Sequence, residues 1–198
     1  MQKPNHFKKT VFAILILTSL ALLPASGAVA QTVKLYADQG HSNVGFSVSL
    51  AGGLSRITGK YNEFEVVVNY VDSDMTKSTI EANIKTASIS TGISGRDEHL
   101  CAPDFFDAAK YPQITFTSDS IVKSENGFIA YGTFTMHGVS KKILLPFTIA
   151  GKDAEGSVGF VSRCSIKRTD YLMGKGDDFV SDEIHVEIDF IAKQKKAK

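Results

Sequence analysis

Alternation of apolar and polar residues limits the fold of this 198-residue chain more than any other feature of its sequence. In the segment 42–50, small polar residues share one face, and a period of two is that of a β-strand with one buried face. The apolar face of this segment is made by Val44, Phe46, Val48 and Leu50. The same pattern recurs in segments 33–37, 54–70, 78–89, 113–123, 128–134, 141–150, 157–166 and 184–190.

The turns between these segments are mostly short, which favours antiparallel neighbours. Asp72-Ser73-Asp74 and Glu125-Asn126-Gly127 are turn sequences, and the second is typical of a hairpin. Parallel α/β folds are excluded because the crossover helices that they need are missing. A sheet of about eight strands that closes on itself removes its two exposed edges. The sequence therefore predicts an all-β, eight-stranded, antiparallel up-and-down barrel, with a bend or bulge at Gly59.

The first thirty residues have the pattern of a secretory signal peptide. Three lysines in the first nine residues precede an apolar run over 11–23 and an Ala-Val-Ala motif at 28–30. The apolar run is shorter than the roughly 20 residues that a membrane-spanning helix needs. We expect cleavage after Ala30, so that residues 1–30 are the signal peptide and residues 31–198 form one exported, soluble domain.

Charge gives no indication of a nucleic-acid partner. Without the three lysines of the leader, 19 of the 22 basic residues remain against 21 acidic ones, a formal balance of −2. A nearly neutral chain lacks the basic surface that binds a phosphate backbone. We therefore expect no nucleic-acid partner, and the sequence allows both a monomer and a homodimer.

Cys101 and Cys164 are the two cysteines of the chain. An oxidising compartment allows them to form a disulfide. The chain-entropy model gives a loop of 63 positions (164 − 101) roughly 4 kcal/mol of stabilisation, less any strain. Two buried free thiols are the alternative, and the sequence leaves both open.

The run Arg96–Phe106 is the densest group of reactive side chains, with an arginine, a histidine and a cysteine in its first six residues. The spacing from Ser94 to Asp97 predicts that Ser94 caps a short helix. On such a helix His99 and Cys101, two positions apart, point to different sides. The run therefore offers no nucleophile–base pair, and we interpret it as a helical segment at one end of the barrel.

Residue spacing also argues against a metal site and an active site. No pair of histidines has a His-x-His or His-x-x-x-His spacing, and a metal normally needs three or four convergent ligands. No Gly-x-Ser-x-Gly motif of a nucleophile elbow is present. We therefore expect neither enzymatic activity nor a cofactor. The histidines of the mature chain are His41, His99, His137 and His185.

Phenylalanines are spread over seven of the expected strands, as a phenylalanine-lined interior requires. An eight-stranded barrel is just wide enough either to be filled by its own side chains or to hold one ligand, and the sequence leaves both outcomes open. An open cavity would bind an apolar chain, since each buried methylene contributes about 0.8 kcal/mol. The residues assigned to this interior are Phe46, Phe64, Phe116, Phe134, Phe147, Phe160 and Phe190.

Several short motifs stand in order along the mature chain. They are Asp38-x-x-His41-Ser42-x-Val44-x-Phe46, Gly59-x-Tyr61-x-x-Phe64, Arg96-Asp97-x-His99-Leu100 with Phe105-Phe106-Asp107, Tyr111-Pro112-x-Ile114-x-Phe116, Thr135-Met136-His137-Gly138-Val139-Ser140-Lys141, Arg168-x-Asp170-Tyr171 and Asp182-Glu183-Ile184-x-Val186. Singly these motifs are weak, but together they resemble the pattern of the YceI-like family of exported, lipocalin-like proteins. The similarity extends from Val33 to Lys193.

The resemblance implies a lipocalin-like, eight-stranded antiparallel barrel with a short helical segment at one end. It implies that a polyisoprenoid or related long-chain lipid occupies a hydrophobic interior, that the protein works in the periplasm, and that it has no catalytic residues. Transport, storage or a stress response would be its role. The cysteine pair is not part of the family pattern.

We therefore interpret the segment 96–106 as a lid on the barrel. Leu100 is expected to face the ligand from this lid, and Arg96, His99 and Arg168 are expected to meet its polar head group at the mouth. The alternative function is that of a metal- or redox-linked periplasmic accessory protein, which would use the histidines or cysteines.

Overall fold

The structure, a computed structural model, describes residues 31–174 and 176–195, so the expected signal peptide at 1–30 lies outside the described residues. Within these ranges no helix is long and apolar enough to cross a membrane. The strands are β1 (Thr32–Ala37), β2 (Asn43–Leu50), β3 (Ser55–Tyr61), β4 (Phe64–Val71), β5 (Thr79–Lys85), β6 (Ile89–Ser90), β7 (Gln113–Ser124), β8 (Gly127–Met136), β9 (Val139–Lys152), β10 (Val158–Lys167) and β11 (Val180–Lys193). The helices are α1 (Ser94–Leu100) and the 3₁₀ turns η1 (Gln39–His41), η2 (Ala51–Gly53), η3 (Met75–Lys77), η4 (Thr86–Ser88) and η5 (Arg168–Tyr171).

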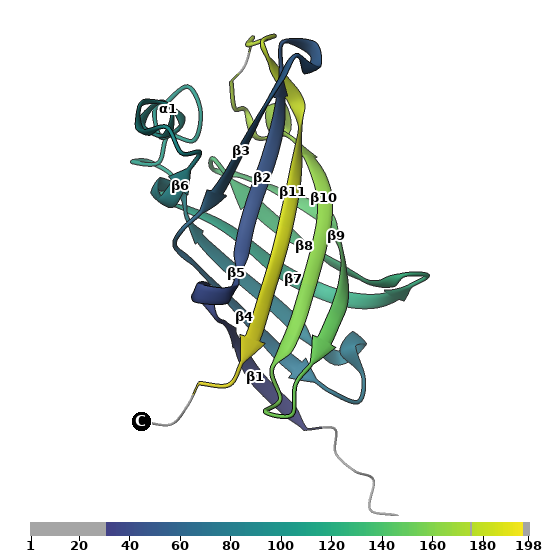
Figure 1. Ribbon diagram of the computed structural model, residues 1–198. Coiled ribbons are helices and arrows are strands. Elements are labelled where there is room, and N and C mark those ends of the chain that lie inside the picture. The colour runs from purple at the N-terminus through teal and green to yellow at the C-terminus, as the bar shows by residue number, and fades with distance from the viewer. Residues whose placement is uncertain (1–30, 175, 196–198) are drawn as a thin grey trace, which may run out of the picture.

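All pairings are antiparallel and follow the order β1-β4-β5-β7-β8-β9-β10-β11-β2-β3-β6, and β1 also pairs with β11. This last pairing closes a ring of eight strands, which confirms the predicted barrel (Figure 1). β1 and β2 lie in succession along β11, β1 beside Ala192 and Lys193 and β2 beside residues 180–189. β1 and β2 therefore act as one long strand that is broken at residues 38–42.

The predicted strand 54–70 is likewise two strands, β3 and β4, which pair with β2 and β1 respectively. The predicted bulge at Gly59 is wrong, because the register of β2 with β3 runs through Gly59 without a shift and sets it opposite Phe46. A Cβ at position 59 would overlap the Phe46 ring. Glycine is needed here for close packing of an aromatic ring and not for a change of strand direction.

The helix predicted near Ser94 is present as α1, but its predicted cap is wrong. Ile93 is the N-cap residue and no side chain caps this end, while Ser94 lies inside the helix. The Asp97 carboxylate instead accepts hydrogen bonds from the Thr91 amide (2.8 Å) and the Thr91 hydroxyl (2.5 Å). Arg96 donates to the same threonine, from Nε to Oγ1 (2.7 Å) and from Nη2 to the carbonyl (3.0 Å). Both charged side chains therefore fasten α1 to Thr91, the residue that follows β6.

Buried side chains form two clusters, one at each end of the barrel. The larger cluster is built from the inward face of the strands and includes Leu35, Val68 and Val158, which are almost completely buried. The smaller cluster lies beneath α1 and η5. Its buried members are Ile89, Phe106, Ile114, Met136, Tyr171 and Met173.

The break between β1 and β2 is held against the end of β11 by Asp38. Its carboxylate accepts hydrogen bonds from Lys193 Nζ (2.5 Å), from the Gly40 amide (3.2 Å) and, at 3.0 Å, from His41 Nδ1. The bond from Lys193, followed by that from His41, lowers the pKa of Asp38 to about 2. The backbone adds a further tie, since the Asp38 amide donates to the Ile191 carbonyl (2.8 Å).

We predict that Asp38→Asn lowers the thermal unfolding midpoint at pH 7 and that this difference disappears in acid. A carboxyl whose pKa falls on folding stabilises the folded state above its unfolded pKa, here 3.8, and this stability is lost as the pH falls through about 2. Circular dichroism melts at pH 7, 4 and 2 measure the difference. Glu65→Gln, on an exposed position of β4, controls for the lost negative charge. A constant difference between wild type and Asp38→Asn at all three pH values would contradict the prediction.

Candidate functional site

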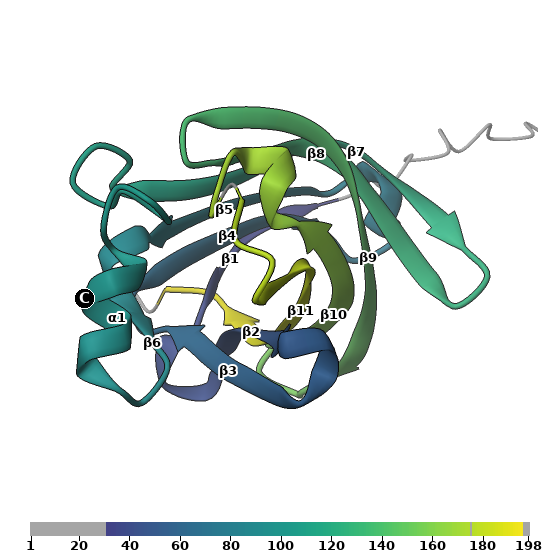
Figure 2. The ribbon, with the colours of Figure 1, turned by 90° about the horizontal axis from the view of Figure 1, so that it is seen from above.

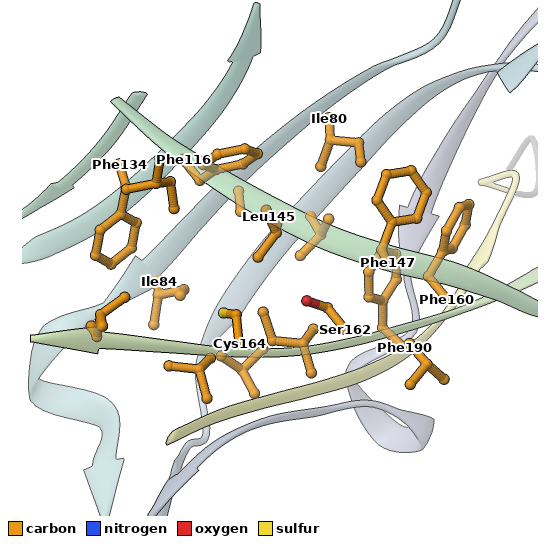
Figure 3. Close-up of a pocket in the computed structure, with 18 residues that line it drawn as sticks. Ile80, Ile84, Phe116, Phe134, Leu145, Phe147, Phe160, Ser162, Cys164 and Phe190 are labelled. Atoms are coloured by element: carbon orange, nitrogen blue, oxygen red, sulfur yellow. The ribbon is translucent and has the colours of Figure 1, made fainter. Parts of the chain in front are cut away.

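A hollow inside the barrel consists of two adjoining cavities. The inner cavity has a volume of about 100 Å³ (Figure 3), and the outer cavity, beneath α1, has a volume of about 140 Å³. Six residues line both, so the two cavities lie end to end. These shared residues are Val44, Ile84, Phe134, Ile166, Val186 and Ile188.

This hollow is too large to be a packing defect. Protein interiors contain few voids larger than a water molecule. An engineered apolar cavity of about 150 Å³ stays dry and takes up benzene, so each cavity here has the size of a small binding site. At about 24 cal/mol per Å³, the inner cavity alone costs about 2 kcal/mol when empty. A bound apolar group would remove this cost, and the structure decides the open question in favour of an interior with free space.

The walls of the inner cavity are almost entirely apolar. Among the described residues that line it, Ser162 and Cys164 carry the polar side chains. The Ser162 hydroxyl donates to the Pro146 carbonyl (2.7 Å) and is therefore satisfied. Burial raises the pKa of the Cys164 thiol, which keeps it protonated and poorly nucleophilic at neutral pH. The inner cavity thus suits an uncharged hydrocarbon chain.

Six of the seven phenylalanines assigned to the interior border the hollow. Figure 3 shows Phe116 and Phe134 at one end of the inner cavity and a group of three aromatic rings at the other. In that group Phe160 stacks on Phe190, with ring centroids 4.9 Å apart, and Phe147 lies against Phe160. Phe46 lines the outer cavity.

Phe64 is the exception, because it is buried in the larger cluster and borders neither cavity. Aliphatic residues that we did not assign complete the wall, among them Ile143, Leu145 and Ile166. The alternation that identified the strands carried this signal, since these residues occupy the inward positions of β9 and β10.

The residues expected at the mouth of the barrel have different surroundings in the structure. Leu100 lines the outer cavity from α1, as expected for a lid residue. Arg96 is bonded to Thr91 and lines neither cavity. His99 is exposed, with Nε2 3.2 Å from Asp104 Oδ2 and its ring against Phe105. Neither Arg96 nor His99 lines either cavity.

Arg168 borders the outer cavity but is committed to the protein backbone. Its side chain is buried, and its five N–H groups donate to five carbonyls. The accepting residues are Met173 (2.9 Å), Val180 (2.8 Å), Ser181 (3.2 Å), Gly174 and Asp177. Arg168 therefore organises the segment that covers the outer cavity and has no N–H left for a ligand.

Cys101 and Cys164 are not bonded to each other, so the structure shows two free thiols and the alternative of a disulfide is wrong. Cys101 follows the last residue of α1 and packs in the smaller cluster. Burial raises the pKa of the nearby Tyr61 hydroxyl group, and a thiolate charge on Cys101 would raise it further. Cys164 projects from β10 into the inner cavity (Figure 3). The two side chains thus lie in different parts of the interior. Burial raises the pKa of both thiols.

Within the described part of the chain, no group of three or more His, Cys, Asp or Glu side chains could hold a metal ion. The histidines lie apart from one another. His41 contacts Asp38, His137 contacts the Tyr171 carbonyl (2.9 Å), and His185 contacts Ser165 Oγ (3.0 Å).

The barrel wall opens between β9 and β10. Backbone pairing of these strands is confined to residues 158–161 of β10 and 148–152 of β9, and it ends where Pro146 lacks an N–H. Beyond that point an outer groove of about 450 Å³ lies between the strands. Ile143 and Ile166 line both this groove and the inner cavity, so the wall is one side chain thick there.

Comparison with known proteins gives consistent matches over most of the chain. A family model described as the YceI-like domain matches residues 36–192. A UPF0312 protein of Vibrio campbellii is 31% identical over 188 residues, which cover 91% of this chain and 97% of that protein. The crystal structure of a YCEI protein of Campylobacter jejuni is 32% identical, with a TM-score of 0.67 over 72% of this chain and 88% of that one.

A third match concerns the fold alone, because its sequence identity is 15%. It is a polyisoprenoid binding domain from Saccharophagus degradans, with a TM-score of 0.63 over 83% of this chain and all of that domain.

We predict that Arg168→Met lowers the free energy of unfolding by about 3 kcal/mol, because five backbone carbonyls, all buried or part-buried, lose a charged donor. Chemical denaturation measures this as a lower midpoint with an unchanged slope. Arg56→Met, on an exposed position of β3, should change the free energy by no more than about 0.5 kcal/mol. A loss below about 1 kcal/mol in Arg168→Met would contradict the structural role of Arg168.

We also predict two free thiols for each chain in protein purified without reductant. Titration in denaturant should find both, and Cys101→Ala and Cys164→Ala should each leave one. In the folded protein both thiols should react slowly, since burial raises their pKa values. Thiols that can be titrated only after reduction would show that Cys101 and Cys164 form a disulfide.

Proposed function

The chain belongs to the YceI-like domain family, and on that premise we propose that it is a lipid-binding protein that holds a polyisoprenoid or related long-chain lipid inside its barrel. The two adjoining apolar cavities inside the barrel are the observation that carries this proposal. Two small cavities in series suit a narrow chain better than a compact ring system. A protein of the same fold is named for binding polyisoprenoids, which supports the same ligand class.

Burial of the hydrocarbon tail supplies the binding energy in this proposal. Each methylene that leaves water contributes about 0.8 kcal/mol, so ten contribute about 8 kcal/mol before the cost of immobilisation is subtracted. The apolar inner cavity would take the end of the tail, and the aromatic stack around Phe160 would stop it there. A polar head group would stay at the other end, beyond the outer cavity, where it keeps its contact with water.

The proposed role is to carry or store such a lipid in the periplasm. A signal peptide at residues 1–30 would export the chain, and residues 31–198 would form the carrier. We assign binding and not catalysis, because the described residues that line the two cavities include no nucleophile beside a base. The thiol of Cys164, the one reactive group on the inner wall among the described residues, is held in its protonated form.

The proposal predicts that protein purified from the periplasm contains about one polyprenyl-type lipid for each chain. Extraction with organic solvent and mass spectrometry would identify the lipid, with metal analysis of the same sample. A lipid in stoichiometric amount and no metal would support the carrier. An empty barrel with bound copper or zinc would instead favour a metal-linked accessory protein.

A cavity-filling variant tests where the lipid lies. Val186 lines both cavities, so Val186→Trp should lower lipid occupancy at least tenfold, because the indole ring takes the space of the chain. Val122→Trp, on the exposed face of β7, should leave occupancy unchanged. Native mass spectrometry measures the occupancy, and thermal melts establish that both variants fold. Full occupancy in a folded Val186→Trp variant would place the lipid elsewhere.

A further inference from the structure

Four large apolar side chains are exposed at one end of the barrel. Leu54 is 90% exposed, Leu172 63%, Phe179 60% and Ile93 56%. All four lie in connections between strands and not on strand faces. Apolar side chains of this size gain free energy when they leave water, so their presence at one end indicates a surface that something covers. We call these four residues the apolar rim.

A strand pairing and a hydrogen bond bring two members of the rim, Leu54 and Phe179, close together. Val180 pairs with Leu50, and the Ala51 amide donates to the Phe179 carbonyl (2.7 Å), so Phe179 lies beside η2, which Leu54 follows. Leu172 follows η5, and Ile93 is the N-cap residue of α1. Figure 1 shows α1 and the turn between β2 and β3 at the same end of the barrel, and Figure 2 looks down on that end.

The rim continues inward to the walls of the hollow. Met173, the neighbour of Leu172, and Val180, the neighbour of Phe179, both line the outer cavity. Leu172 holds a φ of +61°, a conformation that a leucine adopts at a cost in strain. The strained residue is thus one that exposes its side chain to water. At both places an exposed apolar residue is therefore followed in the chain by one that lines the outer cavity.

The groove between β9 and β10 reaches the same end of the barrel as the apolar rim. Tyr171 lines the groove between β9 and β10, and Leu172 follows it in the chain. Charged residues next to the rim have mixed signs, with Arg56 near Leu54 and Asp177 and Asp178 before Phe179. Electrostatic attraction would therefore contribute little to a contact made by the rim.

We propose that the apolar rim docks the barrel on a lipid bilayer, with Leu54, Ile93, Leu172 and Phe179 inserted between the lipid chains. This inference rests on the proposed function, because a protein that holds a membrane lipid must take it from a bilayer and return it. The four side chains stand on three connections at one end of the barrel, which suits insertion into a fluid surface. Docking in this orientation lets a tail move between the bilayer and the hollow without crossing water.

The test is sedimentation of the mature chain, residues 31–198, with phosphatidylcholine vesicles. Wild type should bind, and binding should change little between low and high salt. Leu54→Ser, Ile93→Ser and Phe179→Ser should each weaken binding about tenfold, as should Leu172→Asn, because asparagine tolerates a positive φ. The matched control is Leu144→Ser, which removes a leucine as exposed as Ile93 (56%) from the side wall of the barrel.

Two results would overturn docking on a bilayer. One is equal vesicle binding by wild type and a variant that carries all four substitutions. The other is wild-type self-association in light scattering that the same four substitutions abolish, which would make the rim an interface between copies of this chain.

A separate measurement distinguishes this inference from the proposed function. A fluorescent long-chain fatty acid, added without vesicles, should bind wild type and the fourfold variant with equal affinity, because the rim lies outside the hollow. If wild type binds vesicles but not the probe, lipid carriage fails and docking stands. If both proteins bind the probe and neither binds vesicles, docking fails and lipid carriage stands.

Discussion

Closure of the sheet between β1 and β11 is the constraint on which the rest of this structure depends. The direct pairing is short, Tyr36 with Lys193 and Ala37 with Ala192, and the Asp38 carboxylate reinforces it from the break between β1 and β2. A closed ring has no edges that could pair with another chain. Closure also fixes the width of the barrel, and at eight strands the inward side chains can leave space along the axis. The hollow of this YceI-like protein thus follows from the same pairing that completes its sheet.

The two ends of the hollow differ because different elements close them. Aromatic rings of the long strands β9, β10 and β11 pack together at the inner end, with Phe160 against Phe147 and Phe190. At the outer end the cover consists of α1 and the connection between η5 and β11. Arg168 holds that connection by five bonds to carbonyls, so it is ordered by hydrogen bonds and not by strand pairing.

Errors at the candidate site share a physical origin. The charged residues of 96–106 and the two cysteines attracted a functional interpretation because they are chemically dense in the sequence. In the structure Arg96 and Asp97 form hydrogen bonds with Thr91, and Arg168 donates to five backbone carbonyls. Cys101 and Cys164 face different walls. Partners of polar side chains depend on the path of loops, and hydrophobic periodicity carries no information about that path. Gly59 is a similar case, because its need for glycine comes from the ring of Phe46 on a neighbouring strand.

By itself the sequence determined the strands, their inward faces and the family, because a period of two and a set of ordered motifs are local properties of the chain. Alternation alone was therefore enough to assign Phe116, Phe134, Phe147, Phe160 and Phe190 to one interior. Only the tertiary structure decided whether that interior was filled, since free volume depends on how side chains from all the strands meet across the barrel axis. Tertiary structure also decided that β9 and β10 separate, that the thiols stay apart, and that Leu54, Ile93, Leu172 and Phe179 gather at one end. Each of these depends on distances between residues far apart in the chain, which alternation along a strand does not encode.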